Sequence, residues 1–486
     1  MSMSAALNNA LSGLNTNARR TQVISDNVAN ALTPGYARRS VSIAPRVTAG
    51  EGAGVTVTGV ARATDPRATG DRRRAEAASG ESAALASAES RLLGSIGGIA
   101  DAGSISARAV TWESALARLA DSPESAALQA DAAAAARGLV SGLNAASQET
   151  QGVRMDADGQ IGLMVSEINS ALESIRELNS DIERMTISGR DTAALDDARS
   201  REIDRISSLV PVRIAGRENG KIALYTPDGG ILLDGRANLL GFEATGQITA
   251  DMTLGSGALS GLTLNGEPIS AGAGDGPLDG GALGAQFAIR DTLAPEAQGQ
   301  LDALAQDLIL RFEDPAVDTT LAVGDPGIFT DEGGAFDALD VIGLAGRLQV
   351  NAAVDPAQGG EAWRLRDGIN AAAQGPVGLD TLPRALMAAL ADPVSAPAGA
   401  GFSGMFGFLD LVQSAVAGRE QASADLESLA AFSGGRFTLL QEAEAAATGV
   451  DTDKELSDLL VVENAYAANA RVIETVDGLL KRLLEI

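Results

Sequence analysis

The 486-residue chain contains neither cysteine nor histidine, and only 3% of its residues are aromatic. Without cysteine it can form no disulfide, no thiolate metal site and no thiol nucleophile. Without histidine it lacks the commonest general base and the commonest metal ligand. Burial must rest on aliphatic and alanine side chains, which suits helices packed through small residues better than an aromatic-lined ligand pocket. We therefore expect no catalytic centre, no metal site and no cofactor.

Positive charge is also scarce, and the formal net charge is -27 at pH 7. Phosphate binding requires clustered cations, so this balance argues against a nucleic-acid partner. It argues equally against docking on an anionic membrane surface. No apolar run approaches the roughly 18 residues of a membrane-spanning helix, and the first residues lack the basic and apolar regions of a Sec signal. Such a chain either stays in the cytoplasm or is exported by another route.

The two ends carry apolar residues at helical spacing. At 4–32 these residues recur mainly in steps of three and four, which predicts an amphipathic helix that ends at Thr33-Pro34-Gly35-Tyr36. Its many asparagines make this helix marginal on its own. From 452 to the end the stripe is more regular and is interrupted by Asn469. A buried asparagine in such a seam tends to fix register and partner number.

The ends also differ in charge. Residues 1–50 contain five arginines against one aspartate, net +4, and residues 449–486 contain eight acidic residues against four basic ones, net -4. Opposite charge steers the two ends toward each other and disfavours pairing of either end with its own copy. From the residues alone, the terminal helices either dock on their own domain or pair within an assembly.

The chain between the ends is predicted to be helical with one change of period. The apolar stripe at 160–187 keeps a three–four spacing through nearly four heptads. After 210 the spacing switches to two, with turns such as Glu218-Asn219-Gly220 and Asn265-Gly266, which predicts a β-meander. The other predicted elements are a hairpin at 40–60, helices at 65–150 with breaks near 94–103 and at Pro123, helices at 191–209, 295–312 and 404–445, and a loop-rich segment at 313–400.

The predicted fold class is mainly α with a β-meander (α+β). The terminal helices form a coiled-coil-like pair, a long helical bundle occupies the middle, and a small loop-rich or β insertion interrupts it. The predicted domains are the N-terminal half of a helical assembly domain at 1–50, a helix-rich domain at 51–312 with the meander at about 210–290, a short outer insertion at 313–400, a return helix at 401–447, and the C-terminal half of the assembly domain at 448–486.

Two acidic stretches could in principle bind a cation. Asp156-x-Asp158-Gly159 begins like a calcium loop, but the third ligand position and the bidentate glutamate are absent. We expect it to form a turn before the 160–187 helix. A solvated acidic loop is expected for Asp314, Asp318, Asp325, Asp331 and Glu332.

Short motifs stand at both ends. The N-terminal ones are Ala-Leu-Asn-Asn-Ala-Leu-Ser-Gly-Leu at 6–14, Ile-Ser-Asp-Asn-Val-Ala-Asn at 24–30 and Thr-Pro-Gly-Tyr-Ala-Arg at 33–38. The C-terminal ones are Gly-Val-Asp at 449–451 and Tyr-Ala-Ala-Asn-Ala-Arg-Val-Ile at 466–473. Together they resemble the paired terminal signatures of flagellar axial proteins, the family of rod, hook and hook-associated proteins. Pro-Gly-Tyr-x-Arg at 34–38 is most similar to the hook-associated members, because rod and hook proteins more often carry Phe followed by Lys.

This resemblance implies a structural protein of the bacterial flagellum that forms a ring at the hook–filament junction by polymerising on the hook tip. The implied partners are copies of itself, the hook protein, the second junction protein and an export chaperone on the C-terminal helix. The implied location is extracellular, reached through the flagellar type III export apparatus without a Sec signal.

Two other functions stay open. A flagellar hook or distal-rod protein belongs to the same assembly class. An exported peptidoglycan hydrolase belongs to another class, and it would require a cleft with paired carboxylates.

The apolar stripes and the terminal motifs together predict an assembly interface on the two end helices. Its expected residues are Leu7, Leu11, Leu14, Asn27, Val28, Asn30, Leu459, Val462, Tyr466, Asn469, Ile473, Val476, Leu480 and Leu483.

Overall fold

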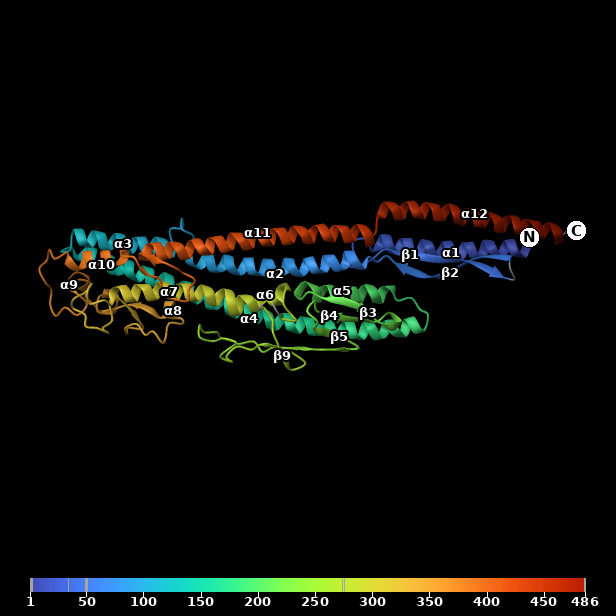
Figure 1. Cartoon of the computed structure of the whole chain (residues 1–486). Coiled ribbons are helices and arrows are strands. Elements are labelled where there is room, and N and C mark those ends of the chain that lie inside the picture. Colours follow the sequence, from blue (N-terminus) through green and yellow to red (C-terminus); the bar gives the residue numbers. More distant parts are fainter. Residues whose placement is uncertain (1–2, 34, 49–50, 273, 275, 485–486) are drawn as a thin grey trace. The chain divides into compact units, whose positions relative to one another are not determined.

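A computed structural model describes residues 3–33, 35–48, 51–272, 274 and 276–484 (Figure 1). The chain forms two compact units, and the division falls within the long helices α2 (Pro66–Ile96), α4 (Ala126–Ile187) and α11 (Phe408–Thr448). Unit 1 comprises Met1–Ser79, Ser166–Leu240 and Ser433–Ile486, and unit 2 comprises Gly80–Val165 and Gly241–Phe432. In the described part of the chain, no helix combines the length and the apolar character needed to cross a membrane.

Unit 1 brings the two ends of the chain together. Helix α1 (Met3–Ala29) packs along helix α12 (Thr452–Leu484), and an antiparallel hairpin of β1 (Arg39–Thr48) and β2 (Glu51–Arg62) packs on α1 (Figure 1). The terminal helix pair and the hairpin predicted at 40–60 are therefore confirmed. The pairing occurs within one chain.

The rest of unit 1 contains α5 (Ala193–Leu209) and a four-stranded antiparallel sheet. The β3–β4 turn places Asn219 and Gly220 at φ of 55° and 77°, a region that asparagine and glycine tolerate best. Inward side chains such as Leu224 and Leu233 are fully buried. The strands follow in the order β3 (Arg213–Gly216), β4 (Ile222–Tyr225), β5 (Ile231–Asp234) and β6 (Arg236–Ala237).

A second small sheet continues the predicted meander. Its hairpin of β8 (Leu262–Leu264) and β9 (Glu267–Ile269) turns at Asn265-Gly266, where both φ angles are positive. A two-residue hairpin turn of type I′ requires positive φ angles at both central residues. The first strand of this sheet is β7 (Leu240–Gly241).

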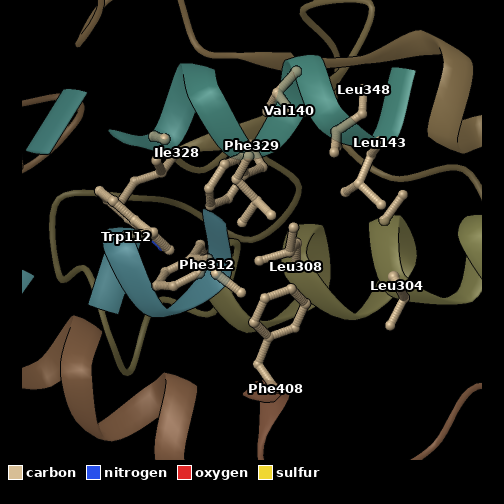
Figure 2. Close-up of a cluster of buried hydrophobic side chains, with 14 of the residues drawn as sticks. Trp112, Val140, Leu143, Leu304, Leu308, Phe312, Ile328, Phe329, Leu348 and Phe408 are labelled. Atoms are coloured by element: carbon tan, nitrogen blue, oxygen red, sulfur yellow. The ribbon is translucent and has the colours of Figure 1, made fainter. Parts of the chain in front are cut away.

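Unit 2 contains the main hydrophobic core. The indole of Trp112 meets the rings of Phe312 and Phe329 edge-on, at centroid distances of 6.5 and 5.9 Å (Figure 2). Aromatic rings prefer such arrangements because the positive edge of one ring faces the negative face of the other. The helices around this core are α3 (Ile105–Asp121), α4, α7 (Ala294–Phe312), α10 (Thr381–Ala391) and α11. The helix α6 (Gly281–Ala288) and the π-helical turn η2 (Ile289–Leu293) precede α7 in the chain.

The segment 313–400 contributes buried side chains to the same core, including Phe329, Leu348 and Leu365. The domain boundaries predicted from the sequence, including those of an outer insertion, remain predictions. The elements of this region are β10 (Phe329–Asp331), α8 (Leu344–Arg347), β11 (Leu348–Val350), η3 (Pro356–Gln358), α9 (Arg364–Asp367), α10 and β12 (Val394–Ser395), and β13 (Met405–Phe406) follows it.

The turn predicted at 156–159 is wrong, because α4 continues through these residues without a break. The Asp158 carboxylate is fully buried, accepts a hydrogen bond from Arg290 at 2.7 Å and accepts another from the Thr245 backbone N–H. An ion pair supported by further hydrogen bonds can hold a charge in the interior. Tertiary packing therefore overrides the weak helix propensity of aspartate and glycine here.

The solvated acidic loop predicted further along is wrong for Asp318. This carboxylate is buried and accepts hydrogen bonds from the backbone N–H groups of Thr320 and Ile369, at 2.9 and 2.8 Å. The Asp318 side chain thereby connects the segment near Thr320 with the segment near Ile369.

Overall, helices dominate and the sheets are small and antiparallel, so the predicted mainly-α class with a minor β component is confirmed.

Candidate assembly interface

The close approach of α1 to α12 depends on Gly13. A Cβ atom at this position would lie 2.7 Å from Nδ2 of Asn469. The glycine therefore lets the polar side chain of α12 rest directly on the backbone of α1. Asn469, which interrupts the apolar stripe of α12, fills the space that a side chain at 13 would occupy.

Asn27 is fully buried, and its amide uses its full hydrogen-bonding capacity. Its Nδ2 donates to the Arg39 carbonyl at 2.8 Å and to Glu455 Oε2 at 3.0 Å. Its Oδ1 accepts from the Tyr36 hydroxyl at 2.9 Å and from the Arg39 backbone N–H at 3.0 Å. Two donors and two acceptors are all that a carboxamide has, so no other side chain could replace it without leaving a buried partner unpaired.

Glu455 completes this contact from the first turn of α12. It is 1% exposed, and its Oε1 accepts a hydrogen bond from Arg38 Nε at 2.6 Å. Arg38 also pairs with Asp458 at 3.1 Å, and its backbone N–H donates to the Thr448 carbonyl at 2.9 Å. Charge-assisted hydrogen bonds are stronger than neutral ones. The motifs at 24–38 and at 449–458 thus form one polar cluster, which we call the terminal clasp (Asn27, Tyr36, Arg38, Arg39 and Glu455).

The contacts Gly13–Asn469 and Asn27–Glu455 fix an antiparallel register, because residue numbers on α1 rise as those on α12 fall. At the N-terminus of α12, the Asp451 carboxylate accepts from the backbone N–H groups of Asp453 and Lys454. This cap starts the helix where the terminal clasp needs it.

A second buried carboxylate ties the hairpin to α5. Asp197 accepts hydrogen bonds from Arg39 and from Arg62, each at 2.6 Å. The Arg39 guanidinium lies 4.8 Å from the centre of the Tyr36 ring. Burial raises the pKa of Tyr36 above its ordinary value of 10.0, so its hydroxyl keeps the proton that it donates to Asn27.

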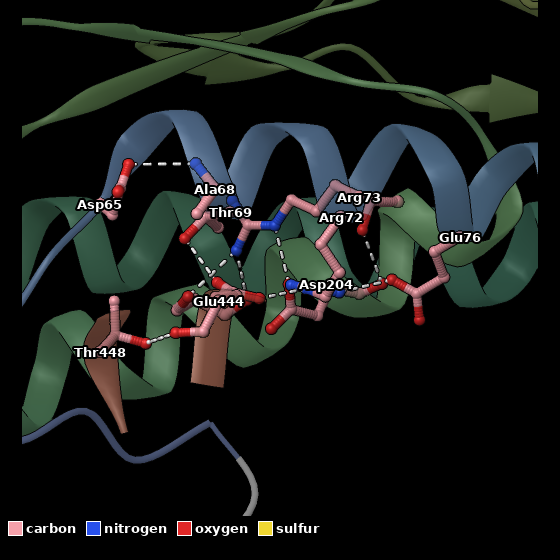
Figure 3. A network of polar contacts seen from close by, with 11 residues as sticks. Asp65, Ala68, Thr69, Arg72, Arg73, Glu76, Asp204, Glu444 and Thr448 are labelled. Carbon is pink, nitrogen blue, oxygen red and sulfur yellow. Dashed lines mark hydrogen bonds and ion pairs between the residues drawn. The ribbon is translucent and has the colours of Figure 1, made fainter. Parts of the chain in front are cut away.

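A third polar network joins α2, α5 and α11 within unit 1 (Figure 3). The Arg72 guanidinium pairs with Glu76 at 2.6 Å, with Glu444 at 2.5 Å and with Asp204. Arg73 also reaches Asp204, at 2.7 Å. Burial raises the pKa of Glu76 above its usual value. Such linked charges are better evidence of a fixed helix arrangement than isolated surface pairs are.

The structure places the predicted interface residues in three groups. Those in the α1–α12 contact or half-buried beside it are Leu7, Leu14, Asn27, Asn30, Leu459, Val462, Asn469, Ile473 and Val476. Those that remain exposed are Leu11, Val28, Tyr466 and Leu480. The side chain of Leu483 lies outside the described residues.

The helix α12 carries a second apolar row that was not predicted from the sequence. Val461, Val472 and Leu479 are all more than 40% exposed. They repeat in helical steps with smaller residues between them, which is the spacing of a packing seam. We call this the second seam (Val461, Ala465, Ala468, Val472, Thr475 and Leu479).

Several residues of the contact were not predicted. Ala10, Val23 and Ile24 are buried in α1 and Glu455 is buried in α12. The Pro-Gly-Tyr-x-Arg motif already contained Arg38, and an acidic residue shortly after Asp451 was the available signal for its partner. In the described part of the chain, no group of three or more His, Cys, Asp or Glu residues is placed to hold a metal ion.

Comparison with known proteins identifies matching families along the chain. Residues 94–319 match the flagellar hook-associated protein FlgK helical domain. Residues 7–36 match the flagella basal body rod protein family, and residues 446–486 match the flagellar basal body rod FlgEFG protein C-terminal family. The two rod-type matches cover α1 with the turn after it, and α12.

Individual relatives agree with these families. The chain is 27% identical over 241 residues to flagellar hook-associated protein 1 of Salmonella typhimurium, covering 48% of this chain and 43% of the relative. It is 26% identical over 267 residues to flagellar hook-associated protein 1 of Bacillus subtilis, covering 51% and 52%. The matches thus span about half the length of these relatives. The flagellar hook junction protein FlgK from Burkholderia pseudomallei aligns with a TM-score of 0.43 at 20% identity, over 55% of this chain and 46% of that one.

The two termini form a helix pair that matches rod-type flagellar families, and they flank a middle region that matches the flagellar hook-associated helical domain. The middle of the chain is similar to the helical domain of hook-associated proteins, and the curated relatives that it resembles carry the name flagellar hook-associated protein 1.

Proposed function

We propose that this chain is a structural subunit of the hook–filament junction that polymerises on the tip of the hook. The observation that carries the proposal is the second seam of α12. One face of α12 is docked on α1 of the same chain, while Val461, Val472 and Leu479 of the second seam remain exposed in the described part of the chain. Scattered exposed apolar residues are normal, but an apolar row along a helix marks an interaction surface.

Further apolar side chains lie exposed on the same part of unit 1. Leu460 on α12 is 62% exposed, and Ile43 and Val47 on the hairpin are 52% and 64% exposed. Contacts of a helix face on one copy with another surface of the next copy are heterologous, and heterologous contacts generate rings or helical arrays. The surface chemistry therefore favours copies of the same chain as the first partner.

The names of the relatives support the place of assembly. The FlgK helical domain family matches the middle of the chain, rod-type families match its two ends, and the curated relatives are called flagellar hook-associated protein 1. We propose the hook protein as the partner on one side of the ring and the second junction protein on the other. We also propose an extracellular location, type III export without a Sec signal, an export chaperone on α12, and no catalytic role.

Electron microscopy of a strain that lacks the gene tests this proposal. The expected result is intact hooks without filaments and flagellin shed into the medium. Loss of the hook as well would instead support a hook or distal-rod protein, the alternative that the rod-type matches at the two ends favour. Complementation with the wild-type gene is the control, and normal filaments in the deletion strain would contradict both functions.

A further inference from the structure

Unit 1 contains a groove of about 1000 Å³ that lies away from the α1–α12 contact. This volume is at the upper end of the range of about 300–1,000 Å³ typical of binding pockets. Apolar side chains from α5 and from the β3–β4 edge form part of its lining, and Ile214 among them is 45% exposed. The groove is also lined by the arginines Arg62, Arg73, Arg74, Arg199 and Arg213.

The carboxylates that line the groove already form hydrogen bonds or ion pairs. Asp65 accepts hydrogen bonds from two backbone N–H groups at the start of α2. Asp196 pairs with Arg199 at 2.7 Å, and Glu444 binds Thr69 and Arg72. The acids of the lining therefore have little capacity left to neutralise its cations.

Some of the positive charge in the groove is uncompensated. Among the described residues, no carboxylate lies within ion-pair distance of the exposed Arg213, and Arg74 pairs only with Asp71 on its own exposed helix face. Burial lowers the pKa of Arg199 and the neighbouring charge of Arg62 lowers it further, while its ion-pair partner Asp196 opposes the shift. Crowded guanidinium groups in a chain of net charge -27 favour an acidic occupant.

The chain itself carries a segment of the required chemistry. Residues 313–346 contain eight acidic residues and no lysine or arginine. Within this segment, Asp337 Oδ1 accepts a hydrogen bond from the Leu339 backbone N–H at 2.9 Å, which shapes a turn. That turn presents Leu339, 95% exposed, between the exposed carboxylates of Asp337 and Asp340, of which Asp340 also pairs with Arg347 at 3.3 Å. An aliphatic side chain between two acids matches a groove that combines apolar lining with free arginine.

We propose that the groove of one copy binds the 337–342 loop of a second copy of this chain. The charges of the two units agree with this pairing. Unit 1 carries 25 basic against 28 acidic residues, so its net charge is -3 and unit 2 holds -24 of the total -27. The groove belongs to unit 1 and the loop to unit 2, so the contact joins two different surfaces. This contact goes beyond the proposed pairing of terminal helices and does not depend on it.

The natural absence of cysteine makes a cross-linking test unambiguous. One variant carries Ile214→Cys in the groove and a second carries Ala338→Cys in the loop, and the two full-length chains are mixed and oxidised. Since each chain has a single thiol, any disulfide between different variants is intermolecular. The matched control replaces Ala338→Cys with Val323→Cys, because Val323 is 94% exposed in the same acidic segment but outside the loop.

The expected result is a heterodimer yield for 214 with 338 that exceeds the yield for 214 with 323 by roughly five-fold or more. Neutralising the loop with Asp337→Asn and Asp340→Asn, which keeps a side-chain acceptor for the Leu339 N–H, lowers that yield, and so does Arg213→Gln. Raising the ionic strength to about 1 M, where charges are screened beyond about 3 Å, has the same effect. Equal yields for the two pairs, or no heterodimer with 338, overturn the proposal, and neither outcome bears on the terminal helices.

Discussion

Asn27 and Glu455 are separated by 428 residues in the chain, yet their side chains meet in a buried hydrogen bond of 3.0 Å. This bond unites the N-terminal and C-terminal signatures in one polar cluster. The N-terminal and C-terminal motifs are therefore the two halves of one contact. They specify how the two ends of a single chain pair, and that pairing leaves Val461, Val472 and Leu479 of the second seam exposed.

Replacing Asn27 by alanine should open the terminal clasp. The substitution removes four hydrogen bonds and leaves buried partners unsatisfied, which costs on the order of 2–4 kcal/mol. Native-state hydrogen exchange should show faster exchange at the C-terminal end of α1 and the first turns of α12. The matched control is Asn30→Ala, because the Asn30 side chain bonds only to nearby groups among the described residues, the Asp26 carbonyl and the Thr33 hydroxyl. Equal effects of the two substitutions would show that the clasp does not hold the helices.

Substitutions at Gly13 should act through Asn469. Gly13→Leu should separate the helices, because a Cβ there already falls within 2.7 Å of the Asn469 amide. Gly13→Ala should be milder, since the end of the Asn469 side chain can move and alanine favours the helix by about 1 kcal/mol. A double-mutant cycle with Asn469→Ala should give a coupling energy of about 1 kcal/mol in hydrogen-exchange stability. Strict additivity would mean that the two residues do not touch.

The carboxyl group of Asp302 in unit 2 should give a distinctive pH dependence. Burial raises its pKa above the ordinary value of 3.8, although it accepts hydrogen bonds from Gln298 and from the Gly343 and Ala345 backbone. The folded chain therefore binds a proton at a pH where the unfolded chain has not yet done so. Lowering the pH through the folded pKa toward 3.8 should stabilise the wild-type chain relative to Asp302→Asn.

Denaturant unfolding of both chains across this pH range measures that difference. The Asn variant is the appropriate control because it keeps an acceptor oxygen but cannot titrate. The unfolding free energy of the wild type minus that of the Asn variant should rise as the pH falls. A value of this difference that stays constant or decreases as the pH falls would contradict the raised pKa.

The sequence predicted the elements better than the contacts between them. The period of the apolar residues was enough to place the terminal helices and the hairpin. It also identified the apolar row of α12 that faces α1, but it did not identify the second row on the same helix. Leu480 continues the buried stripe and is nevertheless 41% exposed.

Polar contacts over long sequence separation were the least predictable. Nothing local distinguishes the asparagine at 27, which is saturated with hydrogen bonds, from its neighbour at 30. Asp158 looked like a turn residue because its partner Arg290 is 132 positions away. Nothing in the sequence near Gly13 indicates its contact with Asn469, which is 456 positions away.

The most direct test of the central claim is the accessibility of the second seam before and after assembly. A single Val472→Cys substitution should react with a maleimide in the free chain, where Val472 is 43% exposed, and should be protected in intact flagella. The control, Val377→Cys in unit 2, replaces another exposed valine outside the seam. The account predicts at least a ten-fold slower reaction at 472 in flagella, an equilibrium protection of about 1.4 kcal/mol. Equal labelling of position 472 in the free chain and in flagella would contradict it.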